Sequence, residues 1–170
     1  MCSNHPEKYL AGSFIEAVSY AGFNLDSNFQ IDARKITGSL DTQIEDAMHF
    51  FRKNRLVSAR KNPDRQEIVS FSERAIFEAI VNAVAHRDYS IHGSKIRFFM
   101  LEDRIEIYSP GDLPNTLTLD TIEMRQSTRN ELISNLLSDC PVKEDNSISR
   151  KHYMEKRGEG VPIIFNESLK

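Results

Sequence analysis

Glu78 and Asn82 are the side chains whose types and spacing most directly suggest chemistry. They lie four residues apart, so a helix would place both on one face. Such a pair can give an oxygen ligand to a hard cation such as Mg²⁺, while the carboxylate holds or deprotonates a water. His86 continues the line, since the three residues fall at about 0°, 40° and 80° around a helix. A polar helix face is more often simply hydrated, and spacing alone favours that alternative.

Gly158 and Gly160 form a second candidate feature, directly before a predicted final helix that has Pro162 in its first turn. Unpaired N–H groups and the positive end of the helix dipole can receive phosphate oxygens at such a position. A lone GxG pair more often marks a turn or a helix entry. The chain has no GxxxxGKS/T motif, which excludes a P-loop motor, and the full Rossmann glycine pattern is also missing.

The HRDY sequence at residues 86–89 has two other enzymatic interpretations. A protein-kinase catalytic loop would need Asn five residues after Asp88, where the chain has Gly93, and its glycine loop is missing. A hydrolase triad of His86, Asp88 and Ser90 would need a GxSxG elbow, which the chain lacks. Asp88 is therefore expected to cap the helix exit or to anchor the following turn.

A helix from residue 72 to about residue 86 must position the first of these groups. Ser72 is its expected N-cap, with Glu73 in the first turn. Its apolar residues form a core stripe opposite the polar line: Ile76, Phe77, Ile80, Val81 and Val84. A preceding amphipathic helix is predicted over residues 42–53, where Thr42 and Glu45 have capping-box spacing.

The remaining pattern predicts strands, turns and short helices. Apolar residues on both sides of the turn-rich segment 61–64 favour a hairpin over residues 55–71. Alternation over residues 95–107 predicts a second hairpin with one buried face, which residues 109–114 break. Residues 13–20 fit either a strand or a short helix. A helix is predicted over residues 130–137, and a polar loop over 139–150.

Composition limits the kind of protein this can be. The 170 residues carry 22 Lys and Arg against 25 Asp and Glu, a net charge of -3, which disfavours binding of nucleic acid through a broad basic surface. The two cysteines have neither CxxC nor Cys/His spacing, so neither a disulfide framework nor a zinc site is indicated. With no signal pattern and no apolar stretch that could span a membrane, a cytoplasmic protein is expected.

Four segments, in order, resemble the RecG-like transcriptional regulators, a family that also carries the label of ATP-dependent DNA helicase. They are EAIVNAVAHRDYS at 78–90, IEIYSPGDLP at 105–114, STRN at 127–130 and RGEGVP at 157–162. The resemblance covers about residues 38–168. The C-terminal region of that family is a GHKL-type ATP-binding domain, the class shared by histidine kinases, gyrase, Hsp90 and MutL. Helicase activity is not expected, because translocating motors use P-loop chemistry.

The resemblance implies an α+β fold, the GHKL or Bergerat-type α/β sandwich, with a mixed sheet and helices on one face. It implies that ATP lies between helix, sheet and a lid formed within residues 112–157. Carried over by position, Asn82 would ligate Mg²⁺ and Glu78 would be the general base for the attacking water. The expected nucleotide-binding residues are Asn82, His86, Ser109, Gly111, Arg129, Gly158 and Gly160, where the phosphate role of Arg129 follows from its charge alone.

The first glycine box departs from the broad GHKL pattern DxGxG. Ser109 stands where Asp would read the adenine amino group, Gly111 matches the first glycine, and Leu113 replaces the second. Losing one charge-assisted contact of about 1.5 to 3 kcal/mol would weaken binding roughly 10- to 100-fold. In this family a Schlafen AlbA-type domain comes first. Residues 1–37 resemble its tail or a linker, and residues 38–170 would form the ATP-binding domain.

Two functions follow from the resemblance. The first is a Mg²⁺-ATP-binding regulatory domain, with slow hydrolysis, whose lid closure changes how a DNA-binding module outside this chain or a second subunit docks. A homodimer is expected from relatives. The second is a degenerate scaffold or dimerisation domain that binds no nucleotide, which Ser109 and Leu113 favour. A third interpretation, direct DNA binding through the basic residues of segment 52–65, competes with an ordinary solvated hairpin.

Overall fold

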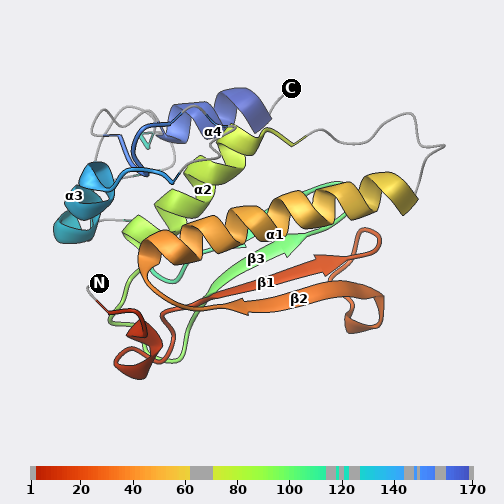
Figure 1. Cartoon of the computed structure of the whole chain (residues 1–170), viewed down its shortest axis with the longest axis horizontal. Coiled ribbons are helices and arrows are strands. Elements are labelled where there is room, and N and C mark those ends of the chain that lie inside the picture. The colour runs from red at the N-terminus through yellow and green to blue at the C-terminus, as the bar shows by residue number, and fades with distance from the viewer. Residues whose placement is uncertain are drawn as a thin grey trace.

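The computed structural model describes residues 3–61, 71–113, 118, 121–122, 127–143, 148, 150–155 and 160–168. Within these ranges one sheet has the strand order β2-β1-β3-β4, and α1 and α2 lie against one of its faces (Figure 1). The strands are β1 (Ile15–Tyr20), β2 (Gln30–Ile36), β3 (Ile96–Met100) and β4 (Ile105–Tyr108); the helices are α1 (Leu40–Lys61), α2 (Glu73–His86), α3 (Glu131–Asp139) and α4 (Gly160–Ser168). Short 3₁₀ turns at Pro6–Lys8 and Ser27–Phe29 precede and follow β1.

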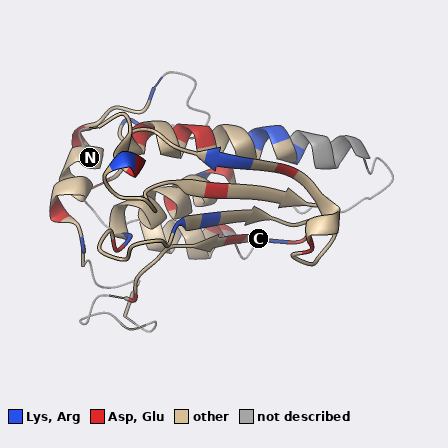
Figure 2. Ribbon diagram, turned by 90° about the horizontal axis from the view of Figure 1, so that it is seen from below, with Lys and Arg blue, Asp and Glu red and all other residues tan. Residues whose placement is uncertain are grey.

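The sheet is mixed. β1 pairs antiparallel with β2 and parallel with β3, and β3 pairs antiparallel with β4. Strand alternation buries Ile96 and Phe98 of β3 on the helix-covered side and leaves Arg97 exposed. Figure 2 shows the opposite side, where none of the described α-helices crosses the strands. The predicted α+β class, a mixed sheet with helices on one face, is confirmed.

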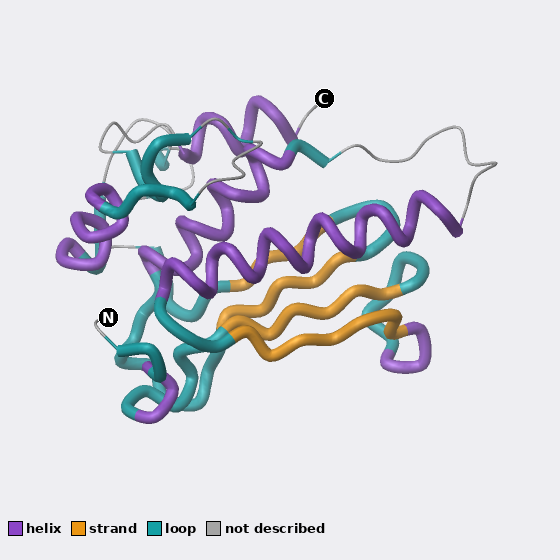
Figure 3. Tube along the Cα trace, viewed as in Figure 1, coloured by secondary structure: helices purple, strands orange, loops and turns teal. Residues whose placement is uncertain are grey.

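The hydrophobic core lies between the sheet and the first two helices. Phe50 of α1 meets Phe98 of β3 edge to face, with ring centroids 6.2 Å apart, a favoured aromatic geometry. Phe77 of α2 stacks on Tyr153 at 6.3 Å. On its other side α2 contacts two further helices: α4 runs beside it, and α3 lies near its C-terminal end (Figure 3). α2 is therefore held between the sheet and these two helices.

α1 corrects two predictions. It begins at Leu40, before the predicted start, and it continues to Lys61 through residues that were expected to form a strand, so the first half of the predicted 55–71 hairpin is wrong. The helical period was hidden at Asn54, a polar residue at a buried position. Its Nδ2 is satisfied there because it donates to Phe50 O at 2.9 Å and to Asp32 at 3.2 Å. Residues 62–70 of that prediction lie outside the described residues.

The capping box predicted for α1 is also absent. The Glu45 carboxylate accepts a hydrogen bond from the hydroxyl of Tyr153, and the Thr42 hydroxyl pairs with Ser39 Oγ at 2.9 Å.

The other predicted elements are present with slightly shifted ends. The segment 13–20, which fitted a strand or a helix, contains strand β1.

The N-terminal strands share the sheet with the rest of the chain. β1 pairs with β3 in a continuous register from Ile15↔Ile96 to Ser19↔Met100, and Lys95 donates to Glu16 at 2.7 Å. The domain boundary placed after residue 37 is therefore crossed by hydrogen bonds within one sheet. That residues 1–37 derive from an AlbA-type module stays a prediction.

Candidate functional site

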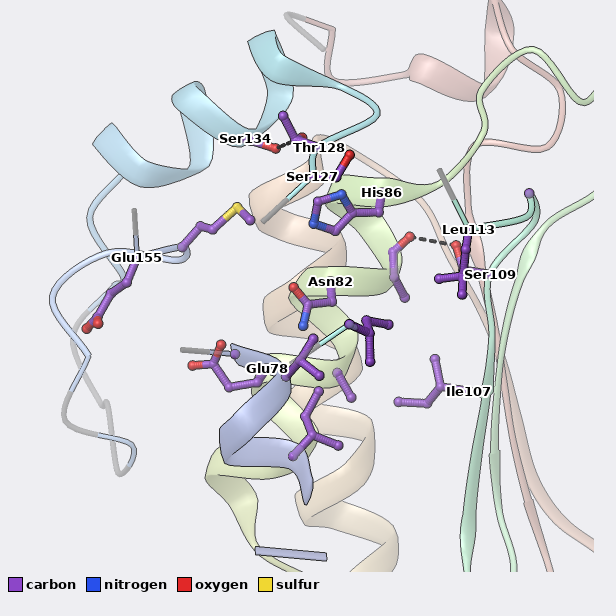
Figure 4. A pocket seen from close by; sticks show the side chains of 18 of the residues that line it. Glu78, Asn82, His86, Ile107, Ser109, Leu113, Ser127, Thr128, Ser134 and Glu155 are labelled. Atoms are coloured by element: carbon purple, nitrogen blue, oxygen red, sulfur yellow. Dashed lines mark hydrogen bonds between the residues drawn. The ribbon is translucent and has the colours of Figure 1, made fainter. Parts of the chain in front are cut away.

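α2 carries the predicted polar line and fixes it by burying its other face. Ser72 is the N-cap, as predicted, since its Oγ accepts from the Ala75 N–H at 3.2 Å. All members of the predicted core stripe are buried: Ile76, Phe77, Ile80, Val81 and Val84. Glu78, Asn82 and His86 consequently face a cavity instead of bulk solvent, one after another along the helix (Figure 4).

The cavity has a volume of about 860 Å³ and lies among α2, β4, α3 and α4, within the size range of small-molecule sites. Apolar side chains line its β4 and α4 sides, and hydroxyl and amide groups line its α3 side. Six of the predicted site residues line it: Glu78, Asn82, His86, Ser109, Gly111 and Gly160. Gly158 lies outside the described residues.

Asn82 and Gly160 meet at the cavity wall. Asn82 Nδ2 is buried, and no hydrogen-bond acceptor among the described residues reaches it. A Cβ added at Gly160 would lie 3.1 Å from that nitrogen and 3.0 Å from Glu78 Oε2. The first residue of α4 must therefore be very small, because its backbone packs directly against both polar side chains. A buried amide group without a partner is costly, and a ligand in the cavity could satisfy it.

Glu78 is buried and forms an ion pair with Arg150, whose guanidinium also pairs with Glu155. Burial raises the pKa of the Glu78 carboxyl group above its ordinary value, and the positive charge of Arg150 opposes that rise. Arg150 was missed from the sequence because it stands in a polar loop and in none of the four family-like segments. A lone Arg in such a loop gives no signal for a contact that spans 72 positions.

His86 completes the polar line at the end of α2. Burial lowers the pKa of its imidazole, and the nearby positive charge of Arg129 lowers it further. A lowered pKa keeps the ring neutral at pH 7. His86 can therefore serve as a hydrogen-bond donor or acceptor at the cavity wall, but it brings no positive charge for an anionic ligand.

Three motif residues cap the C-terminal end of α2. The last carbonyl groups of a helix have no partner within it. Here Ser109 Oγ donates to Ala83 O at 2.8 Å, the Tyr89 hydroxyl to Val84 O at 2.9 Å, and Asn130 Nδ2 to Ala85 O at 2.9 Å. The Ser109 proton is thus committed to the helix, and only the oxygen lone pairs of this hydroxyl remain for a group in the cavity.

Asp88 anchors the turn after α2, as one of its two predicted roles required. Its Oδ1 accepts from the N–H of Ser90 at 2.9 Å, and its Oδ2 accepts from Arg129 at 2.9 Å. These contacts lower the pKa of Asp88, the hydrogen bond with the Ser90 side chain most of all. Arg129 also donates to Asp112 O and is not among the residues that line the cavity. Its guanidinium thus links the turn after α2, through Asp88, with the segment after β4, through Asp112.

The described lining of the cavity is acidic. It includes four carboxylates (Glu78, Asp112, Glu131 and Glu155) and neither Lys nor Arg. No cluster of three or more His, Cys, Asp or Glu able to hold a metal occurs in the described part of the chain. A cation here would therefore take only a few ligands from the protein. The oxygen donors of Asn82 and Glu78 fit Mg²⁺, which usually keeps waters and binds substrate phosphates through its other positions.

Three basic residues of segment 52–65 have described side chains, namely Arg52, Lys53 and Arg55, and each is paired with an acidic side chain. Arg52 and Arg55 both contact Glu73 at 3.0 Å, and Lys53 contacts Asp32 at 2.9 Å. These pairs offset part of the positive charge on which direct DNA binding through this segment would depend. None of the described helices is both long and apolar enough to cross a membrane.

Comparison with known protein families finds a match over the C-terminal part of the chain. The family described as "Putative ATP-dependent DNA helicase recG C-terminal" matches residues 93–170. This match confirms the resemblance to RecG-like C-terminal domains, and with the mixed sheet and its helix layer it identifies the fold as GHKL-like. No curated protein matches the chain.

Among the solved structures that match, the following one shares the fold over most of the chain. The DIP2311 protein from Corynebacterium diphtheriae superposes with a TM-score of 0.60 and 16% sequence identity, over 93% of this chain and 29% of that one. This chain thus spans less than a third of the length of that protein. An identity this low supports a common fold only.

Proposed function

We propose that this chain is a nucleotide-binding domain that takes Mg²⁺-ATP in the cavity beside α2. The observation that carries the proposal is the buried Asn82 amide, which has no acceptor for Nδ2 among the described residues and lies against Gly160 at the start of α4. The match to an ATPase-like family over residues 93–170 supports the same ligand class.

The phosphates would lie at the Asn82 end of the cavity. α4 begins there with Gly160, so its first N–H groups and the positive end of its dipole are available to phosphate oxygens. Pro162 in the first turn lacks an N–H and leaves fewer donors. Mg²⁺, when bound, would offset the repulsion between phosphates and the acidic lining. Asn82 would hold it through its amide oxygen.

The adenine ring of ATP would lie toward β4, where apolar side chains offer a surface for a flat ring. Ile107 and Leu113 line this side of the cavity together with Ser109. Because the Ser109 proton is donated to Ala83 O, its oxygen presents lone pairs and would accept from an amino group such as that of adenine. One neutral hydrogen bond there, in place of a charge-assisted one, predicts modest affinity.

Glu78 is the proposed general base for hydrolysis. A water O–H bond would break as its proton passes to Glu78 Oε2. The water oxygen would then bond to the γ-phosphorus, while the bond from that phosphorus to the bridging oxygen breaks and leaves its electron pair on ADP. A positioned base contributes about 10²- to 10⁴-fold in rate. We further propose that the closed, nucleotide-bound state changes how a second subunit or a DNA-binding module outside this chain docks.

Calorimetric titration with ATP tests the site. We expect Asn82→Ala to weaken Mg²⁺-ATP binding at least tenfold, and removal of Mg²⁺ with a chelator to weaken binding by the wild type similarly. Asn166→Ala, on the exposed face of α4, is the matched control and should bind like the wild type. Equal binding by the Asn82 variant would remove its role in the site.

The competing function is a scaffold that binds no nucleotide, and the acidic lining of the cavity is the observation that favours it. A thermal-shift titration separates the two functions. A ligand at 100 times its dissociation constant should add about 2.7 kcal/mol of stability. The absence of any shift with millimolar ATP and Mg²⁺ would decide for the scaffold.

A further inference from the structure

We propose that Arg150 is a positioning residue that orients the Glu78 carboxylate for hydrolysis, with one oxygen held and the other left for water. This inference rests on the proposed function. The two oxygens of Glu78 have different surroundings: Oε1 accepts from Arg150 Nη2, whereas Oε2 lies toward Gly160, where a Cβ would come within 3.0 Å of it. The same Cβ would lie 3.1 Å from Asn82 Nδ2, so Oε2 faces the proposed phosphate end.

Arg150 reaches Glu78 from outside the cavity. Glu78 and Glu155 both line the cavity, but Arg150, which pairs with both, does not. Its side chain is 5% exposed. A residue that contacted the phosphates directly would have to line the cavity. The placement therefore suits a group that acts through Glu78.

The guanidinium is held on both sides. Nη2 donates to Glu78 while Nη1 pairs with Glu155. A planar guanidinium with two fixed partners loses little freedom when it forms each contact. Glu78 is thereby prevented from rotating Oε1 toward the cavity, and Oε2 stays in place.

The loop that carries Arg150 is itself tied to the core. Tyr153 is 1% exposed, stacks on Phe77 and donates to Glu45. The backbone N–H of Val142 donates to Lys151 O at 3.0 Å, and that of Met154 to Leu137 O at 3.2 Å. The guanidinium is thus placed by the fold before any ligand arrives, and such preorganisation is what the orienting group of a general base requires.

A double-mutant cycle between Arg150 and Glu78 tests the inference. We expect Glu78→Gln to lower kcat for ATP at least 100-fold, and Arg150→Met to lower kcat at least tenfold with ATP affinity changed less than threefold by calorimetry. Arg150→Met added to Glu78→Gln should cause no further loss of kcat, because Arg150 acts only through that carboxylate. A merely structural role would reduce kcat again in the double variant.

Two more variants keep the test decisive. Arg150→Lys retains the charge but not the rigid fork, so it should fold and show a kcat between wild type and Arg150→Met. Arg104→Met, at an exposed arginine of the β3–β4 turn, should leave kcat unchanged. All variants are measured where circular dichroism shows them folded.

The outcomes separate this inference from the proposed function. If the wild type hydrolyses ATP and both Arg150 variants match it, the positioning role is wrong while the function stands. Additive losses in the double variant also overturn the role. If the wild type neither binds nor hydrolyses ATP, the proposed function fails and this inference with it.

Discussion

Gly111 shows how closely the residues after β4 pack on the turn after α2. Its φ of +112° lies in the region that favours glycine. A Cβ there would lie 2.7 Å from Asp88 Cβ and 3.3 Å from the Asp88 backbone nitrogen. The glycine therefore allows the N–H of Asp88 to donate to Pro110 O at 2.8 Å. The first glycine of the predicted box thus has a structural role, whatever it contacts in a ligand.

We expect Gly111→Ala to lower the free energy of unfolding by about 3 kcal/mol, from backbone strain and steric overlap together. Gly22→Ala is the matched control, because Gly22 has a φ of +95° but no atom within 4 Å of an added Cβ. It should cost about 1 kcal/mol, from strain alone. Urea unfolding measures both. Equal losses would show that contact with Asp88 adds nothing.

At the scale of elements, α2 is held at both ends by side chains from distant parts of the chain. At its N-terminus, Ser72 donates to Glu167 of α4. At its C-terminus, Asn130 donates to Ala85 O at 2.9 Å and to Arg87 O at 2.8 Å. Asn130 is also the residue directly before α3, and its side chain makes no capping bond to that helix. It therefore joins the start of α3 to the C-terminal end of α2.

We expect Asn130→Ala to lower the free energy of unfolding by about 2 kcal/mol, because two carbonyl groups lose their donor. Asn166→Ala on exposed α4 should change it by less than about 0.5 kcal/mol. Chemical denaturation followed by circular dichroism gives both values. A loss no larger than that of the control would show that water replaces the Asn130 amide without cost.

The sequence predicted α2 and its polar face well because helical spacing, an N-cap and a clear apolar stripe all agree there. It failed at residues 55–61, where the buried but hydrogen-bonded Asn54 interrupts the apolar period of α1. For the site, motif positions indicated Glu78, Asn82 and Gly160. Arg150 could not be found, because its partner lies 72 positions away and only the fold brings the two together.

At the scale of the whole molecule, the N-terminal segment is part of the packed structure. Ile15 and Ala17 of β1 are almost fully buried, at 1% and 0% exposure. A Cβ at Gly12 would lie 1.9 Å from Ser94 O and 2.7 Å from Arg87 Nη2. The N-terminal segment therefore packs against the same HRDYS motif that borders the cavity.

A chain that lacks residues 1–37 should not fold cooperatively, because it loses β1 and β2, leaves one edge of β3 unpaired and uncovers the side of α1 that packs on those strands. Heating followed by circular dichroism should show no sharp transition, and amide resonances should be poorly dispersed. Removing residues 1–4 only, which leaves both strands intact, should preserve the transition. A cooperative transition in the shorter chain would place an independent domain after residue 37.

The parallel pairing of β1 with β3 also governs when this protein can fold during its synthesis. Register partners such as Ile15 and Ile96 are separated in the sequence by β2 and by the whole of α1 and α2, so the ribosome must release the chain beyond Met100 before the central ladder can close. Until then β1 has only its hairpin partner β2, and a two-stranded hairpin is marginally stable in water. Closing so distant a pair is intrinsically slow, so the unpaired edge of β1 stays exposed to association with other chains during that time.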